Sequence, residues 1–229
     1  MNSITRFKIF TCVFLFFLTL SYAQGLNIGD IVDPNRNNRD LWGDGGRENI
    51  IGSPYLLDEW MMGEIKTKSG AVYPNIKIKY AAYSDQLFFL SENGDERTIA
   101  REKVQHFQFN DNDGNAYLFK HIPYHGFLLN LASGDVSLFK KIVKEIKEAP
   151  EPNGYNSSVG QAEFILRETY YISPSKDGIV QSVSNKKEFV SLFPDLESKI
   201  SKYIKQNKVR FKKDEKIIGL VNYTASIKN

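Results

Sequence analysis

The feature that most constrains the fold is a series of short alternating segments between residues 62 and 148. In the segment NIKIKY, Ile76, Ile78 and Tyr80 fall on one face of an extended chain, and two lysines fall on the other. A period of two is the signature of a strand that is buried on one face. Similar runs recur in QLFFLS, HFQFN, AYLFKHI and GFLLNLA, with Asn-Gly and other turn signals between them.

Short strands at this regular spacing predict an antiparallel meander, curled into a barrel or folded into a sandwich of about eight or nine strands. Two of these strands are expected in residues 163–173 and 178–183. Residues 140–147 fit either the end of a strand or one face of a helix, and the pattern leaves both open. Residues 149–160 contain two prolines and two glycines, which predict an exposed loop.

The pattern changes to a helical period in residues 183–229. Asn185 followed by Glu188 resembles a capping box at the start of a helix. We expect Pro194 to end this helix and Asp195 to cap the next one. The apolar residues of that next helix recur on one face: Leu196, Ile200, Tyr203 and Ile204. The predicted fold class is therefore α+β, mainly β, with two or three short helices after the sheet.

The segment GSPYLLDEWMMGEI, residues 52–65, separates a polar lead from the first alternating strand. The lead, residues 24–51, has no sustained period and is predicted to be loosely ordered. The Gly-Ser-Pro turn at the start of the segment would direct the following tyrosine and leucines into the core. We therefore expect a β-rich domain over residues 52–182, with helices over 183–229 packed on it or beside it.

The N-terminus has the three parts of a secretory signal peptide, residues 1–23. Two basic residues precede an apolar run of twelve residues, and the small residues Ser21 and Ala23 follow it. We expect cleavage between Ala23 and Gln24. The alternative is an N-terminal membrane anchor, but a twelve-residue helix spans about 18 Å, whereas the hydrocarbon core of a membrane is ~30 Å thick. The sequence thus predicts a periplasmic or extracellular protein without a transmembrane segment in its mature form.

Removal of this segment changes what the composition implies. The single cysteine, Cys12, leaves with it, so the mature chain would have no disulfide and no cysteine metal ligand. The charge becomes nearly balanced, because 28 of the 30 basic residues remain against 27 acidic ones. That balance argues against a nucleic-acid partner. The charge is uneven, however, since 12 basic and 6 acidic residues follow from Lys176 onward.

His121 and His125 in HIPYH are the best candidates for metal ligands. Pro123 lies between them and disfavours the helix that this spacing needs, and no third ligand follows at a familiar spacing. The segment NDNDGN resembles a calcium loop. When Gly114 is aligned to the required glycine, a phenylalanine and a lysine fall at the first and last ligand positions. We therefore expect ordinary strand-end histidines, a polar hairpin turn, and neither a metal nor a cofactor.

Two Ser-x-x-Lys pairs match the spacing of serine–lysine acylases: Ser137 with Lys140, and Ser173 with Lys176. That chemistry needs the serine at the start of a helix and a desolvated lysine one turn later. The first pair lies in a predicted strand and the second in a proline-containing turn, so no catalytic residue is predicted. No pair of carboxylates stands out either.

The predicted helix after Pro194 has lysines on its polar side: Lys199, Lys202, Lys205 and Lys208. Such a row is typical of a solvated helix face. The alternative is an anionic partner, such as a lipid headgroup, a phosphorylated sugar polymer or an acidic protein.

Several pieces of the chain resemble a family of uncharacterised exported proteins of Gram-negative bacteria. They are GSPY followed by Trp60, VYPNIKIKYAAYSDQLFFL, and the final DLESKISKYIKQNKVRFKKDEKIIGLVNY. The resemblance covers nearly all of the mature chain. It departs from the family at Ala81, where asparagine is common, and at Lys216, where an acidic residue is usual. It implies export, a β-rich body and a helical tail, and it brings no known activity or site.

The sequence therefore predicts a non-catalytic envelope protein that contacts another envelope protein or a surface polymer, through binding residues that the sequence does not identify. The alternative is a ligand-binding β-barrel for a small hydrophobic molecule or a glycan, which the many aromatic residues suggest. A periplasmic hydrolase is the third hypothesis, and it would need a cleft of converging polar groups.

Overall fold

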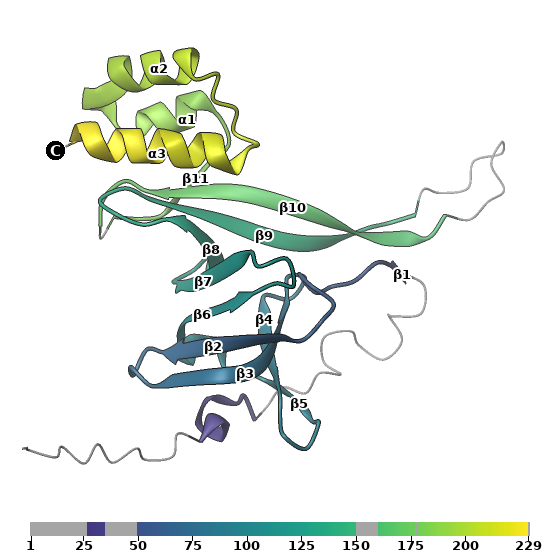
Figure 1. Ribbon diagram of the computed structural model, residues 1–229. Coiled ribbons are helices and arrows are strands. Elements are labelled where there is room, and N and C mark those ends of the chain that lie inside the picture. The colour runs from purple at the N-terminus through teal and green to yellow at the C-terminus, as the bar shows by residue number, and fades with distance from the viewer. Residues whose placement is uncertain (1–26, 35–49, 150–159, 177, 229) are drawn as a thin grey trace, which may run out of the picture.

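The computed structural model describes residues 27–34, 50–149, 160–176 and 178–228 (Figure 1). The strands in these ranges are β1 (Ile50–Ile51), β2 (Met61–Thr67), β3 (Val72–Ala81), β4 (Gln86–Leu90), β5 (Glu96–Thr98), β6 (Val104–Asn110), β7 (Ala116–Ile122), β8 (Gly126–Ala132), β9 (Ser137–Lys147), β10 (Ala162–Ser173) and β11 (Gln181–Val183). The helices are α1 (Lys186–Ser191), α2 (Glu197–Gln206) and α3 (Asp214–Lys228). The predicted signal peptide and its cleavage site lie outside the described residues.

The prediction of a mainly β protein with C-terminal helices is confirmed, but the sheet is not a simple meander. All described strands belong to one sheet with the order β1-β10-β9-β8-β7-β6-β2-β3-β4-β5, and β11 pairs with β10. After β5 the chain returns to the free edge of β2, where Gln108 of β6 lies opposite Glu64. The sheet is open, with β1 and β5 at its two ends, and it does not form two separate sheets.

β9 and β10 form a long antiparallel ribbon. They pair along their whole common length, from Lys147 opposite Glu163 to Ser137 opposite Ser173. The helical alternative for residues 140–147 is therefore wrong, because every residue of that stretch has a strand partner in β10. Beyond the region paired with β8, the free edge of β9 meets the end of β3, where the Lys144 amide donates to the Ala82 carbonyl at 3.3 Å. The sheet is thus strongly curled.

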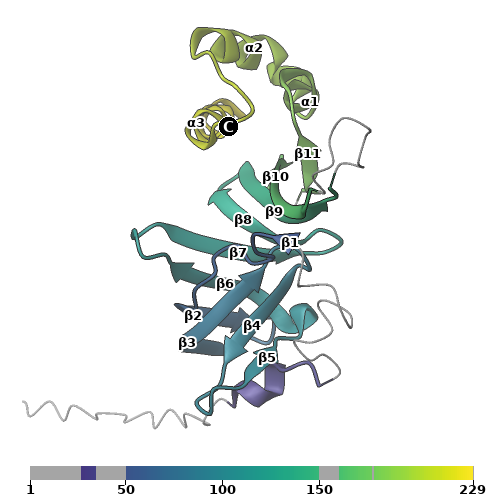
Figure 2. The same cartoon turned by 90° about the vertical axis from the view of Figure 1, so that its right-hand side faces the viewer.

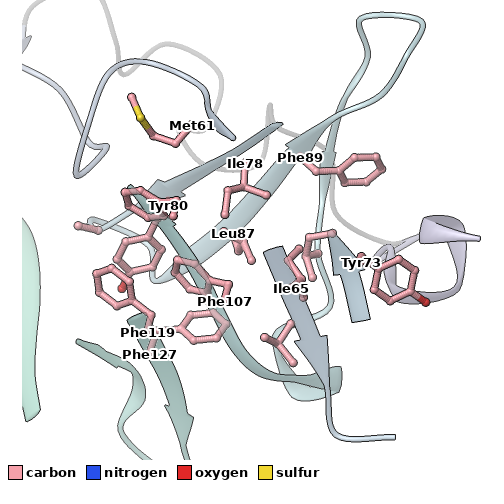
Figure 3. Close-up of a cluster of buried hydrophobic side chains, with 14 of the residues drawn as sticks. Met61, Ile65, Tyr73, Ile78, Tyr80, Leu87, Phe89, Phe107, Phe119 and Phe127 are labelled. Atoms are coloured by element: carbon pink, nitrogen blue, oxygen red, sulfur yellow. The ribbon is translucent and has the colours of Figure 1, made fainter. Parts of the chain in front are cut away.

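The ribbon separates two hydrophobic cores. The first core fills the curled part of the sheet, where Tyr80, Phe107, Phe119 and Phe127 lie close together (Figure 3). The rings of Phe107 and Phe119 stack with centroids 4.9 Å apart. The second core lies between the ribbon and the helices, which are on the opposite side of β9 and β10 from β2 and β6 (Figure 2). The ribbon contributes Ile142 to the first core and Leu138, Tyr170 and Ile172 to the second, whereas residues 166–169 of β10 are exposed.

The second core joins strand and helix residues, so the helical segment packs on the β-rich part rather than apart from it. Its fully buried members include Leu138 and Ile172 of the ribbon and Phe189, Ile200 and Ile217 of the helices. The apolar spacing predicted for α2 is confirmed, since Ile200 and Ile204 are its buried residues.

Helix boundaries follow local signals, with one exception. The predicted capping box is present, because the Glu188 amide donates to Asn185 Oδ1 at 3.0 Å and the Glu188 carboxylate accepts from the Ser184 amide at 2.7 Å. The prediction that Asp195 caps α2 is wrong. Pro194 starts a 3-10 turn that includes Asp195, and α2 follows directly from Leu196 without a side-chain cap.

Part of the lead is ordered on the sheet, unlike the expectation for residues 24–51. Residues 28–31 form a 3-10 turn that buries Ile31, and the Ile31 carbonyl accepts from the Ala100 amide at 2.8 Å. The Asp33 amide donates to Thr98 of β5 at 2.9 Å. These contacts cover the outer edge of the short strand β5, which limits its exposure as an unpaired edge.

The segment from residue 52 is the entry to the first core. Pro54 is buried and its carbonyl accepts from the Tyr83 amide at 3.1 Å. Trp60 and Met61 do not form an exposed apolar surface, because Met61 is buried and Trp60 is half-buried. The Lys79 ammonium lies 4.9 Å from the centre of the Trp60 ring. This cation–π contact holds Trp60 against β3, so the segment that begins at residue 52 belongs to the folded domain.

Candidate functional site

The two candidate histidines are held by different neighbours. The His121 ring, in β7, packs edge-on against Phe127 with centroids 5.6 Å apart. The His125 ring, in the β7–β8 turn, packs against Tyr171 of β10 at 5.0 Å. Among the described residues, no group of three His, Cys, Asp or Glu side chains is placed to hold a metal ion. The predicted polar turn at residues 111–115 is confirmed, because Asp111 Oδ1 accepts from the backbone amides of residues 113 and 115.

The two Ser-x-x-Lys pairs do not form a nucleophile and its base. Lys140 is buried, and its ammonium lies 2.6 Å from Asp214 Oδ2, while the Ser137 hydroxyl bonds to the Gly134 carbonyl. Ser173 donates to backbone carbonyls in the turn after β10, and Lys176 is exposed. Because i and i+3 lie on opposite faces of a strand, the first pair cannot converge.

Asp85 is the centre of a cluster of ionisable groups at the end of the first core. Its carboxylate accepts from the Tyr80 hydroxyl at 2.6 Å and from the Phe127 amide at 3.3 Å. Arg101 and Lys141 each approach it to 3.0 Å. These four donors come from four separate parts of the chain. With its oxygens so occupied, the Asp85 carboxylate joins these four parts of the chain.

The pKa values of two titratable side chains near Asp85 are shifted in the directions that keep both side chains uncharged near pH 7. Burial and the adjacent Asp85 carboxylate raise the pKa of Tyr80 well above its ordinary value, so the phenol stays protonated. Burial, followed by the charges of Lys68 and Arg101, lowers the pKa of His121. Both groups are therefore neutral near pH 7, and the cluster is suited to holding the sheet together.

A groove lies over β2, β3, β6, β7 and β8 and encloses about 470 Å³. Its polar lining side chains are mostly amides, and apolar groups complete it. The lining residues are Met62, Gly63, Glu64, Pro74, Asn75, Gln108, Phe109, Asn110, Ala116, Tyr117, Leu118 and Asn130. Met62 is 54% exposed, and Asn75, Gln108 and Asn110 are exposed as well. The groove thus offers several groups that can both donate and accept hydrogen bonds.

A β-bulge shapes one side of the groove. Between Gly63 and Ile65 the register of β2 with β3 shifts, because Pro74 and Asn75 together occupy the position opposite Glu64. Asn75 has φ +55°, a left-handed conformation that asparagine tolerates better than most residues. The bulge turns the Asn75 side chain toward solvent beside the groove.

Close strand contact forms the floor of the groove. A Cβ atom on Gly63 would lie 2.6 Å from the backbone oxygen of Gln108 and 2.5 Å from Cδ1 of Ile78. Glycine is therefore needed where β2 crosses its neighbours.

Two of the amides are oriented by neighbouring side chains. Gln108 Nε2 donates to Glu64 Oε1 at 3.2 Å. The side-chain carbonyl oxygen of Gln108 takes no part in this hydrogen bond. The Ser133 hydroxyl donates to Asn130 Oδ1 at 2.8 Å. Burial and the nearby Asp111 carboxylate raise the pKa of Tyr117, so this lining group also stays neutral. The groove therefore has one carboxylate, and no Lys, Arg or His, among its described lining residues.

Sequence reasoning did not find this groove. Its amides come from three strands that are separated along the chain, and each one alone is an ordinary polar residue on the outer face of a strand. One local signal was available, since the Pro74-Asn75 pair interrupts the alternation ahead of Ile76. A proline inside a strand pattern indicates an edge or a bulge.

No family model, curated protein or solved structure matches the chain. The resemblance to exported Gram-negative proteins therefore stays a prediction. In the part of the chain that the structure describes, no helix is both long enough and apolar enough to cross a membrane.

Proposed function

We propose that the chain is an exported, non-catalytic envelope protein that binds a neutral glycan polymer in the groove over β2, β3, β6, β7 and β8. The observation that supports this most is the convergence of amide side chains from separate strands: Asn75, Gln108, Asn110 and Asn130. Sugar hydroxyl and acetamido groups need partners that donate and accept together, as amides do. Exposed Met62 and the half-buried Tyr117 supply apolar surface for the faces of sugar rings.

The charge of the groove favours a neutral ligand. Glu64 is its single carboxylate, and the described lining contains no cation that would attract an anionic polymer. Hydrolysis of a glycosidic bond commonly requires two carboxylates on opposite sides of the bond. One carboxylate that already accepts a hydrogen bond from Gln108 supports binding without hydrolysis.

The first core argues against a small hydrophobic ligand inside the curled sheet. Phe107, Phe119 and Phe127 are each 0% exposed and fill the space that a barrel ligand would need. In this proposal the curled part is a filled, barrel-like support, and the ligand lies on its outer face, where Gln108 alternates with buried Phe107 and Phe109.

Export is the part of the proposal that rests on the N-terminus alone. To test export, the protein is expressed in a Gram-negative host, and the protein in the periplasmic and extracellular fractions is sequenced from its N-terminus. We expect the exported chain to begin at Gln24. An intact N-terminus on protein that stays in the cytoplasm would contradict export without affecting the groove.

Isothermal titration with N-acetylglucosamine oligomers tests the binding site. We expect binding by the wild-type protein and about tenfold weaker binding by Gln108→Ala, because one hydrogen-bonded contact is lost. Gln105→Ala is the matched control, since Gln105 is an exposed glutamine of the same strand that does not line the groove. Absence of wild-type binding to neutral oligosaccharides, or equal loss in both variants, would overturn the proposed site.

A further inference from the structure

The helical layer has a second surface of different chemistry, which we call the lysine-rich surface. It consists of eight exposed basic residues in α2, in the following turn and at the start of α3: Lys199, Lys202, Lys205, Lys208, Arg210, Lys212, Lys213 and Lys216. Residues 199–216 contain two acidic residues, Asp214 and Glu215. The Asp214 carboxylate forms an ion pair with Lys140 and accepts a hydrogen bond from the Tyr170 hydroxyl at 2.6 Å, so its charge is already paired with a residue of the ribbon.

Within the part of the chain that the structure describes, the cations of this surface have no acidic partner. Among the described residues, none of the eight forms an ion pair, whereas Lys140, Lys141 and Lys147 of the ribbon all do. The chain as a whole is only slightly basic, so this local excess is not a consequence of composition. Exposed like charges this close in sequence repel one another, and an anionic partner would relieve that repulsion.

The apolar faces of the helices are already covered. Ile200 and Ile204 of α2 and Ile217 of α3 are buried in the second core against the ribbon. The helices lie on the side of the ribbon away from the curled sheet, at one end of the molecule (Figure 1, Figure 2). A partner that contacts the outward side of the helical layer would therefore meet charged side chains and not the apolar faces of the helices.

The composition of the surface favours a diffuse anionic plane. Seven of the eight residues are lysines, which act as point charges, whereas bidentate recognition of a single phosphate favours arginine. The two apolar residues of the α2–α3 turn, Val209 and Phe211, are half-buried and pack against the second core, so the exposed part of this turn is mainly cationic. Clusters of about four to eight basic residues on an amphipathic helical segment are typical of segments attracted to anionic lipid headgroups.

We propose that the lysine-rich surface docks the protein onto a membrane surface that contains anionic phospholipid headgroups. This docking is independent of the groove, which lies over β2, β3, β6, β7 and β8 and has no cation in its described lining. The protein would bind the membrane by its helical end and leave the curled sheet free to bind its own ligand.

Cosedimentation with phospholipid vesicles tests the proposal. We expect the protein to bind phosphatidylcholine vesicles that contain phosphatidylglycerol, not to bind pure phosphatidylcholine vesicles, and to be released by salt. Lys208→Gln combined with Lys212→Gln should weaken vesicle binding about tenfold, because each cation near an anionic surface contributes separately. Lys68→Gln combined with Lys77→Gln is the control, since both lysines are exposed on the β-rich part and this pair should bind like wild type.

Three outcomes would overturn the proposal. They are equal binding to both kinds of vesicle, equal weakening by both double variants, and binding to soluble polyphosphate without binding to phosphatidylglycerol vesicles. The third result would assign the surface to a soluble polyanion instead. Circular dichroism of each variant confirms that its fold is retained, and addition of N-acetylglucosamine oligomers should leave vesicle binding unchanged.

Discussion

At the scale of single residues, Asp85 holds together parts of the chain that are distant in sequence. Its side chain is 17% exposed and joins the β3–β4 turn to Arg101, to β8 and to β9. Asp85 itself has φ +54°, and Gly126 allows the approach, because a Cβ atom there would overlap the Asp85 carboxylate. The Ser84-Asp85 turn was predictable from sequence, but its cross-strand partners were not, since they depend on the curl of the sheet.

Replacement of this carboxylate should destabilise the protein. Asp85→Asn removes the negative charge opposite Arg101 and the largely buried Lys141, and we expect a loss of about 2–3 kcal/mol in the free energy of unfolding. Urea denaturation measures it. Asp95→Asn is the control, because the Asp95–Arg97 pair is more than half exposed and its loss should change stability by less than about 0.5 kcal/mol. Equal losses of stability in the two variants would show that the contacts of Asp85 do not stabilise the fold more than an exposed ion pair does.

His121 should make stability depend on pH. Burial lowers the pKa of His121 in the folded protein below its ordinary value of 6.5, so the unfolded chain binds the proton more readily. The resulting stabilisation is complete above pH 6.5 and is lost as pH falls through the window between 6.5 and the lower folded pKa. Unfolding midpoints measured across that window should fall less steeply for His121→Gln. Parallel curves for variant and wild type would contradict this assignment.

At the scale of elements, the β9–β10 ribbon joins the two cores and anchors α3. The Asp214 carboxylate at the start of α3 accepts from Tyr170 of β10 and pairs with Lys140 of β9, whose side chain is 8% exposed. An acidic residue in the first turn of a helix is a common local signal, because its charge is favourable beside the helix dipole. The pairing of Asp214 with a buried lysine was not predictable, because Lys140 looked like an ordinary member of a polar strand face.

Removal of Asp214 should therefore loosen the helical layer. Asp214→Ala leaves the Lys140 ammonium with Glu168, at 3.3 Å, as its remaining acidic partner, and we expect a loss of about 2–4 kcal/mol. Glu168→Ala should cost less, because Glu168 is 41% exposed. Hydrogen exchange measures both the stability and its location. Faster exchange in α3 for Asp214→Ala but not for Glu168→Ala is the expected result, and the reverse order would contradict the role of Asp214.

The strands and helices were predictable because their signals are local. Alternation, glycine-containing turns and the Asn185–Glu188 capping box each depend on residues that are close in sequence. The pairing of β6 with β2 was missed, since both are ordinary half-buried strands and nothing in either selects its partner. The groove was missed for the same reason, because it exists only once that pairing places Gln108 beside Glu64.

At the scale of the whole molecule, two surfaces of opposite character lie on different parts of the fold. Among the described residues, the groove on the curled sheet is lined by amides and one carboxylate, while the helical layer carries eight exposed cations that form no ion pair. The β9–β10 ribbon lies between them, and the two surfaces share no residue. We therefore expect glycan binding and membrane docking to be separable by mutation.

Mapping of amide chemical shifts by NMR, during titration with N-acetylglucosamine oligomers, tests the proposed glycan site most directly. We expect the largest shifts at β2, β6 and β8, around Glu64, Gln108 and Asn130, with little change in α2 and α3. Shifts concentrated in the helices, or no shifts at saturating oligosaccharide, would contradict the assignment of the groove as the binding site.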